Sequence, residues 1–378
     1  MSGGTRVVAI AAKEFKHLRR DPRILAAVLL LPIMQLMLFA YAISFDVKNV
    51  ATVIVDQDKT PASRSYVQAY DASDFFAVLG QADDVAAADR LFDRNQARIV
   101  VVIPAGFARQ LAAGERAEVA VFLDGSEPNT ARIGQAYSIA LNRVYGSRLT
   151  FAWAETQGVD VTGLGQLEPR VRTWYNPEKR SSDFLIPGLL VVIIMIVTVQ
   201  QTAVTLVRER DQGTQEQMSV SPLRQSELML GKLLPWTLLA FVDMVVITVV
   251  GMTVFGVPLR GDVLVLALGA MAFVFSSLGL GLVISAIAPS VDVANITALL
   301  ASFLPAFMLS GFAFALDSIP IVLQWISYLF PARYMVTISR GVFLKGAGFA
   351  ELWPELLALG GYALVVLLIA AALYGRRR

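Results

Sequence analysis

Apolar runs long enough to cross a bilayer recur along most of the chain. They cover Ile24–Phe45, Phe184–Val207, Leu233–Phe255, Val263–Ala288, Val293–Leu316 and Leu356–Tyr374. A transmembrane helix takes about 20 apolar residues, so each run is long enough for one span. A shorter apolar segment, Ile319–Phe330, is bounded by Pro320 and Pro331 and is typical of a re-entrant or interfacial piece. The pattern predicts a polytopic α-helical membrane protein with six transmembrane helices.

The segment between the first two runs, residues 46–183, has the character of a soluble domain. Alternating patterns predict strands at Thr52–Val55, Phe75–Leu79, Ile99–Ile103, Val119–Leu123 and Arg170–Tyr175. Helical patterns lie between them, at Ala62–Tyr70, Val85–Asn95, Ala105–Ala113 and Thr130–Glu155. Strands that alternate with helices predict a mixed α/β domain inserted between the first and second spans.

The N-terminal segment Thr5–Arg20 is amphipathic. Apolar residues recur at helical spacing, and basic residues fill the opposite face: Val7, Val8, Ala11, Phe15 and Leu18 against Arg6, Lys13, Lys16, Arg19 and Arg20. This pattern favours a helix in the membrane interface with its basic face on anionic lipid headgroups. The alternative is a positively charged anchor without a fixed helix. Asp21 and Pro22 end the helical pattern, so the chain can turn there into the first span.

Basic residues in the short flanks predict the orientation, because long translocated domains are exempt from the charge rule. With six spans, three basic flanks fall on one side of the membrane: the N-terminus, the polar interruption Arg208–Lys232 and the tail Arg376–Arg378. We therefore expect both termini in the cytoplasm and the α/β domain outside it.

Composition narrows the possible chemistry. The chain is 56% hydrophobic and 16% charged, unlike a soluble protein. Its net charge of +2 gives no argument for nucleic acid. With no cysteine and one histidine, His17, the chain has no thiolate site and no histidine-rich metal site. We expect neither a metal nor a cofactor on this chain.

Catalytic motifs are missing as well. The nearest approach to a phosphate-binding loop, Gly341–Gly346, is followed by Ala347 where that motif needs lysine. The outer carboxylate pairs Asp56 with Asp58 and Asp83 with Asp84 indicate turns and helix caps first, and a cation site only as an alternative. The sequence therefore predicts a protein that is not an enzyme.

Two features inside the spans have competing interpretations. Asp243 is an ionisable residue in an apolar run, so it either lines a pathway or is held neutral or paired for structural reasons. Small residues recur four apart at Ser277, Gly281 and Ser285, and again at Ala298, Ser302, Ala306 and Ser310. Such stripes first indicate close helix packing, within one chain or between two, and less specifically a substrate-lining surface.

The polar interruption resembles the cytoplasmic loop of type-2 ABC exporter permeases. The residues that carry the resemblance are Glu209, Gly213, Thr214, Glu216, Pro222, Glu227, Gly231 and Lys232. The order of the other segments is similar to the drug-efflux-like branch of that family: a basic amphipathic segment, one span, a large outer domain with VDQD, IPAGF and LDGS segments, then five spans.

This resemblance implies a permease subunit that forms the pathway as a homodimer or heterodimer and exports a hydrophobic or amphipathic substrate, drug or lipid-like. Two copies of a separate cytoplasmic ATPase would bind ATP and Mg²⁺, and a membrane-fusion protein is a further possible partner. The implied ATPase-coupling residues are Glu209, Arg210, Gly213, Thr214, Glu216, Pro222, Lys13 and Lys16. The implied dimer or pathway residues are Asp243, Ser302, Ala306 and Ser310. The implied location is the bacterial inner membrane.

The expected domains are a cytoplasmic helix at 1–23, a first span at 24–45, the outer domain at 46–183 and a five-helix domain at 184–378. The last contains the coupling loop 208–232 and an outer hairpin at 316–353. One alternative function is a non-transporting scaffold whose outer domain recruits an envelope partner. Another is an intramembrane enzyme, which would need more reactive groups in the spans than Asp243 alone.

Overall fold

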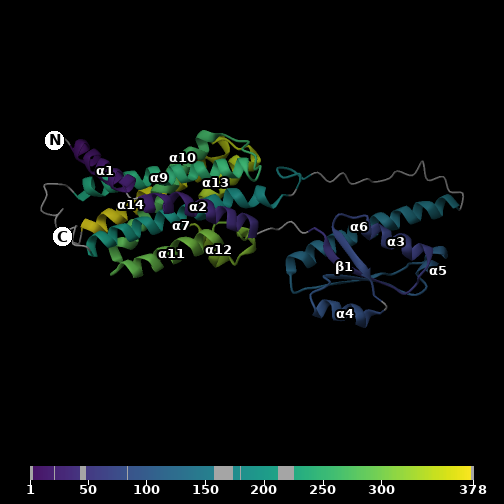
Figure 1. Cartoon of the computed structure of the whole chain (residues 1–378). Helices are drawn as coiled ribbons and strands as arrows, with labels where there is room; N and C mark the ends of the chain where they lie inside the picture. Colours follow the sequence, from purple (N-terminus) through teal and green to yellow (C-terminus); the bar gives the residue numbers. More distant parts are fainter. Residues whose placement is uncertain are drawn as a thin grey trace. The chain divides into compact units, whose positions relative to one another are not determined.

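The computed structural model describes residues 3–20, 22–42, 48–82, 84–156, 173–178, 180–211 and 225–375. The chain divides into two compact units. One contains Met1–Ser44 together with Thr173–Arg378, and the other contains Phe45–Arg172. Each unit is described by itself (Figure 1).

The smaller unit is a four-stranded mixed sheet covered by helices. Its strands are β1 (Val50–Asp56), β2 (Phe76–Gln81), β3 (Ile99–Ile103) and β4 (Ala120–Leu123), in the order β2-β1-β3-β4. β1 is parallel to β2 and β3, and β4 closes the sheet antiparallel to β3. The helices are α3 (Pro61–Asp71), α4 (Val85–Asp93), α5 (Phe107–Ala112) and α6 (Pro128–Thr156). The predicted mixed α/β architecture is confirmed.

Side chains of the central strands point alternately to the two faces of the sheet and form a separate hydrophobic core on each face. Ile99, Val101 and Ile103 of β3 pack with the aromatic residues of α3 and α5, whereas Val100 and Val102 face α4. Because successive side chains of a strand point to opposite faces, this period of two requires a helix on each side. Figure 1 shows α4 on the face of the sheet opposite α3 and α6. The expected strand Arg170–Tyr175 is wrong at Thr173–Tyr175, which is not extended, and its other residues lie outside the described part.

The carboxylates of the α/β unit that were weighed as a cation site, where the structure describes them, are turn and cap residues. Asp56 accepts hydrogen bonds from the backbone N–H groups of Asp58 and Lys59, and Asp84 caps α4 by accepting from the N–H of Ala87. Asp58 accepts from the N–H groups of Gly106 and Ala108, 2.8 and 3.0 Å away, and so holds the start of α5 against the end of β1. Asp83 lies outside the described residues. Among the residues described, no cluster of three possible metal ligands occurs.

The larger unit is a helix bundle. Its long helices are α1 (Gly3–Arg20), α2 (Pro22–Ala42), α7 (Ser181–Asp211), α9 (Gln225–Thr253), α10 (Val263–Ile287), α11 (Val291–Met308) and α14 (Phe349–Gly375). Five of them are long and apolar enough to cross a membrane, and α2 contributes a shorter apolar stretch, Val28–Ala42. Five of the six expected spans are therefore helices of sufficient length and apolarity, and the first expected span contains only the shorter stretch. The expected fifth run, Val293–Leu316, is wrong at its end, because α11 stops at Met308 and Gly311 takes a left-handed φ of 85°.

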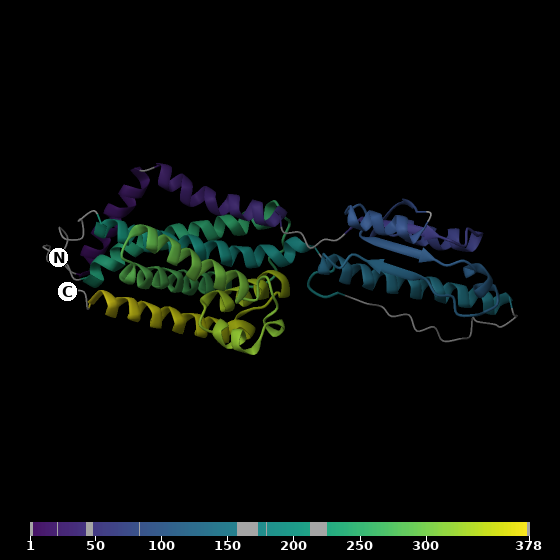
Figure 2. The same ribbon diagram turned by 90° about the horizontal axis from the view of Figure 1, so that it is seen from below.

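Helix α7 is the centre of this bundle. It packs against α2, α9, α10, α11 and α13, and 83% of the residues in its apolar 18-residue stretch are buried. Figures 1 and 2 show that α1, the last turn of α7 and the end of α14 lie at one end of the bundle, which we call the α1 end. The short helices η1 (Leu316–Ser318), α12 (Ile321–Ser327), α13 (Pro331–Arg340) and η2 (Gly341–Lys345) lie at the other end.

A buried arginine fastens the end opposite α1. Arg340 of α13 donates hydrogen bonds to the carbonyl oxygens of Gly311 and Phe312, 2.7 and 3.1 Å away, and lies over the ring of Phe184. These contacts provide hydrogen-bond donors for two carbonyl oxygens of the turn that follows α11, and they join this turn to α7 and α13. Desolvation by burial lowers the pKa of Arg340 to about 10, so this guanidinium remains charged at neutral pH.

Candidate functional site

Helix α1 contacts the first turns of α9 at backbone distance. A Cβ atom built on Gly231 would lie 2.6 Å from the Cβ of Ile10 and 3.0 Å from the carbonyl oxygen of Val7. Only glycine leaves room for this crossing, since any side chain at residue 231 would overlap α1. The structure therefore gives a physical reason for glycine at a position that carries the family resemblance.

An ion pair fastens the same two helices one turn earlier. The Nη1 atom of Arg6 lies 3.6 Å from the Oε2 atom of Glu227, whose side chain is 12% exposed. Glu227 belongs to the first turn of α9, within the polar interruption. A movement of α9 at this point would therefore displace α1 as well.

The apolar face of α1 is divided between protein and surroundings. Leu18 is buried and Val7 is half-buried, whereas Val8 and Phe15 are 64% and 46% exposed. One side of the apolar face of α1 therefore packs on α9, and the expected position of this helix in the membrane interface stays a prediction. The basic residues Lys13 and Lys16 are exposed, and the Nζ atom of Lys13 lies 3.6 Å from Oε1 of Glu14.

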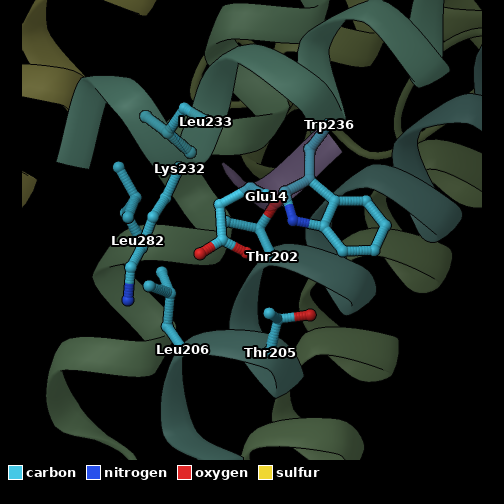
Figure 3. Close-up of a pocket in the computed structure, with 8 residues that line it drawn as sticks. All are labelled: Glu14, Thr202, Thr205, Leu206, Lys232, Leu233, Trp236 and Leu282. Carbon is cyan, nitrogen blue, oxygen red and sulfur yellow. The ribbon is translucent and has the colours of Figure 1, made fainter. Parts of the chain in front are cut away.

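A cavity lies where α1, α7, α9 and α10 meet. Figure 3 shows the eight residues that line it: Glu14, Thr202, Thr205, Leu206, Lys232, Leu233, Trp236 and Leu282. Lys232 is 8% exposed, so a basic and an acidic side chain enter the same enclosed space from α9 and α1. We did not predict Glu14 or Trp236 as part of a site. The polar face of α7 was predictable, because Thr198, Gln201, Thr202 and Thr205 recur at helical spacing in an apolar run.

The predicted coupling loop is described only at its two ends. Residues 208–211 form the last turn of α7, and residues 225–232 form the first turns of α9, so both ends of the expected loop are helical. Arg208 is exposed, and the Nη2 atom of Arg210 donates a hydrogen bond to the carbonyl oxygen of Ala288, 2.6 Å away. Glu209 lies in the same helical turn. The remaining predicted coupling residues, Gly213, Thr214, Glu216 and Pro222, lie outside the described residues.

Asp243 is placed deep in the bundle. Its side chain is 2% exposed, and neither carboxylate oxygen has a hydrogen-bond partner among the residues described. It lines a small cavity between α2, α7 and α9. The lining of that cavity contains none of the other dimer or pathway candidates, Ser302, Ala306 and Ser310, and a pathway role for Asp243 stays a prediction.

The small-residue stripes pack inside the chain. Gly281 of α10 lies against α7, where an added Cβ would come within 2.8 Å of the carbonyl oxygen of Val199. Ser302, Ala306 and Ser310 are at most 1% exposed, and α11 packs along α7. The exposed surface of α11 is a different one, formed by Ile296, Leu300 and Leu304. A dimer or pathway role for the buried stripe stays a prediction.

A bundle of long apolar helices is the architecture of a polytopic membrane protein. The family described as "ABC-2 family transporter protein" matches residues 22–372. The chain belongs to this family and is a permease subunit of an ABC transporter.

Three relatives from Escherichia coli (strain K12) resemble the chain over most of its length. It is 33% identical to "Probable multidrug ABC transporter permease YbhS" over 90% of this chain and 89% of that protein. It is 26% identical to "Probable multidrug ABC transporter permease YbhR" over 93% of each chain. It is 27% identical to "Inner membrane transport permease YhhJ" over 85% of each chain.

Proposed function

We propose that this permease forms the translocation pathway of an inner-membrane exporter as a dimer and is driven by a separate cytoplasmic ATPase that docks at the α1 end. The observation that carries the proposal is the junction of α1 with the start of α9 beside the predicted coupling loop. A force applied to residues 208–232 would reach α7 and α9 directly, and it would reach α1 through Gly231 and the Arg6–Glu227 pair.

Charge supports the cytoplasmic assignment of the α1 end. Exposed basic residues gather there: Lys13, Lys16, Arg19, Arg20 and Arg208. At the opposite end, Arg333 and Arg340 donate hydrogen bonds to neighbouring residues, and the exposed basic residues described there are Arg260 and Lys345. Basic flanks favour the cytoplasmic side, so we infer that α1 and the end of α14 face the cytoplasm. A single passage through α2 then places the α/β unit outside it.

The relatives guide the choice of substrate and partner. Two of them are named as probable multidrug permeases, which supports export of hydrophobic or amphipathic compounds. Because YbhS and YbhR are two different permeases that both resemble this chain, a heterodimer with a second permease is a natural assembly, and a homodimer is the other. ATP and Mg²⁺ would bind to the two ATPase subunits, and a membrane-fusion protein is a further partner that the outer unit is suited to meet.

The proposal is tested by docking and by stimulated ATP turnover in lipid nanodiscs. We expect the double variant Glu209→Ala with Glu216→Ala to lose ATPase docking or stimulation by at least about tenfold. The matched control removes two exposed carboxylates of the α/β unit, Glu115→Ala with Glu118→Ala. Equal loss in both double variants, or in neither, would contradict the coupling role. If deletion of residues 208–232 also left function intact, the scaffold alternative would be favoured.

A further inference from the structure

A buried acidic group without a charge partner stands at the middle of α9. Asp243 is 2% exposed, and its two carboxylate oxygens accept no hydrogen bond from any described residue. An ionisable group in the apolar part of a membrane costs several kcal/mol unless a partner offsets it. The position therefore favours a cation or a hydrogen-bond donor that the described residues do not supply.

The cavity beside Asp243 shows what such a partner would meet. It is lined by the hydroxyl-bearing Thr198 and the amide-bearing Gln201 of α7, by Trp236 of α9 and by apolar residues including Val28 and Leu239. None of the described residues that line it is basic. A carboxylate beside an indole ring is a chemistry that attracts organic cations, through charge and through the face of the ring.

The size of the cavity selects among organic cations. It has room for about one water-sized group. A primary ammonium group is of this size and carries three N–H donors, whereas a trimethylammonium group is larger and carries none. The space is closer in size to the first than to the second.

Towards the α1 end, this cavity shares a lining residue with a second cavity. Trp236 lines both it and the larger cavity that contains Glu14, Thr202, Thr205 and Lys232 (Figure 3). Thr198, Gln201, Thr202 and Thr205 therefore form a polar seam of α7 facing α9. A cation can keep hydrogen-bonding partners along this seam.

We propose that Asp243 receives the primary ammonium group of a lipophilic amine, which reaches it along the α7–α9 seam. Gln201, Thr198 and the ring of Trp236 complete the subsite. The inference rests on the proposed function, since it names the substrate class of the exporter as amines with an apolar body.

Direct binding to the purified permease in nanodiscs tests the proposal without an ATPase or ATP. The probe is monodansylcadaverine, a fluorescent primary amine, and its N-acetyl derivative is the uncharged analogue. We expect Asp243→Asn to weaken binding of the amine at least about tenfold and to leave binding of the N-acetyl compound unchanged. The control variant is Ser277→Ala, which alters another buried polar group that does not line this cavity. It should bind both compounds as the unaltered protein does.

The size argument has its own arm. The N,N,N-trimethyl derivative of the probe should bind several-fold more weakly than the primary amine to the unaltered protein. Asp243→Asn removes a buried charge, and its thermal unfolding temperature should equal or exceed that of the unaltered protein, which excludes misfolding as the cause of lost binding. Equal affinity of the Asn variant for the amine, or equal loss for the amine and the acetylated compound, would overturn the proposal. If ATPase docking fails while this binding persists, the proposed function falls and the amine site stands.

Discussion

Gly231 of α9 lies under Ile10 of α1 so closely that a Cβ atom on the glycine would come within 2.6 Å of the Cβ of Ile10. This contact makes α1 part of the bundle rather than a helix attached only through lipid. It also places α1 beside the start of α9, where the predicted coupling loop ends.

Substitution of Gly231 by alanine should loosen α1 despite favouring helix. Alanine exceeds glycine in helix propensity by about 1 kcal/mol, but overpacking against a backbone carbonyl costs about 1 to 3 kcal/mol. We expect faster hydrogen exchange in α1 and reduced ATPase stimulation. Gly360→Ala in α14 is the matched control, because nothing lies within 4 Å of its added Cβ and only the gain in propensity remains. Unchanged exchange in Gly231→Ala would show that α1 does not depend on this crossing.

The Arg6–Glu227 pair should tolerate exchange of both charges better than reversal of one charge. The two side chains are 32% and 12% exposed, so the pair contributes at most about 1 kcal/mol after solvent screening. Arg6→Glu places two carboxylates together and should accelerate exchange in the first turns of α1 and α9. The double variant Arg6→Glu with Glu227→Arg should recover most of that protection. A double variant as mobile as the single one would mean that the pair does not fasten the helices.

In the α/β unit, Asp124 should make the end of β4 sensitive to acid. Hydrogen bonds from the Ser126 hydroxyl and N–H, with Arg98 beside them, lower the pKa of Asp124 to about 2 from its ordinary 3.8. A carboxylate whose pKa is lowered in the folded state stabilises the fold at every pH above its ordinary pKa. This stabilisation is lost as the pH falls through the lowered pKa. Asp124→Asn should therefore increase hydrogen exchange around residues 120–131 at pH 7.

The difference between Asp124→Asn and the unaltered protein should shrink as the pH falls from about 4 to about 2, where the native carboxyl group becomes protonated. Glu118→Gln serves as control, since Glu118 is 82% exposed and lies 3.9 Å from Arg116. A difference that stays constant across this pH range would assign the effect to something other than the charge of Asp124.

Sequence patterns predicted the elements whose cause is local. The strand Ile99–Ile103 was predicted at its observed bounds, because a run of β-branched residues between two turns can be recognised from the sequence alone. The end of α11 was missed because Leu309–Leu316 continues the apolar run, while the turn depends on the backbone at Gly311 and on the reach of Arg340.

Packing partners were harder to predict than elements. Lipid tails and neighbouring helices are equally apolar, so apolar residues of α1 do not reveal which of them contact α9. The stripe of Ser302, Ala306 and Ser310 likewise indicated close packing without indicating α7 as its partner. The cavity beside Asp243 lies between α7, α9 and the distant α2, and only the fold brings Thr198, Gln201 and Trp236 together there.

Site-specific photo-crosslinking tests the central claim, that the ATPase docks at the α1 end, most directly. A photoreactive amino acid would replace Lys16 or Arg208 at that end, or Leu329 and Glu118 as controls, all of which are exposed. The account predicts adducts with the ATPase from residues 16 and 208 and none from residues 329 and 118. Adducts from residue 329 or 118, with none from 16 or 208, would contradict both the docking surface and the orientation in the membrane.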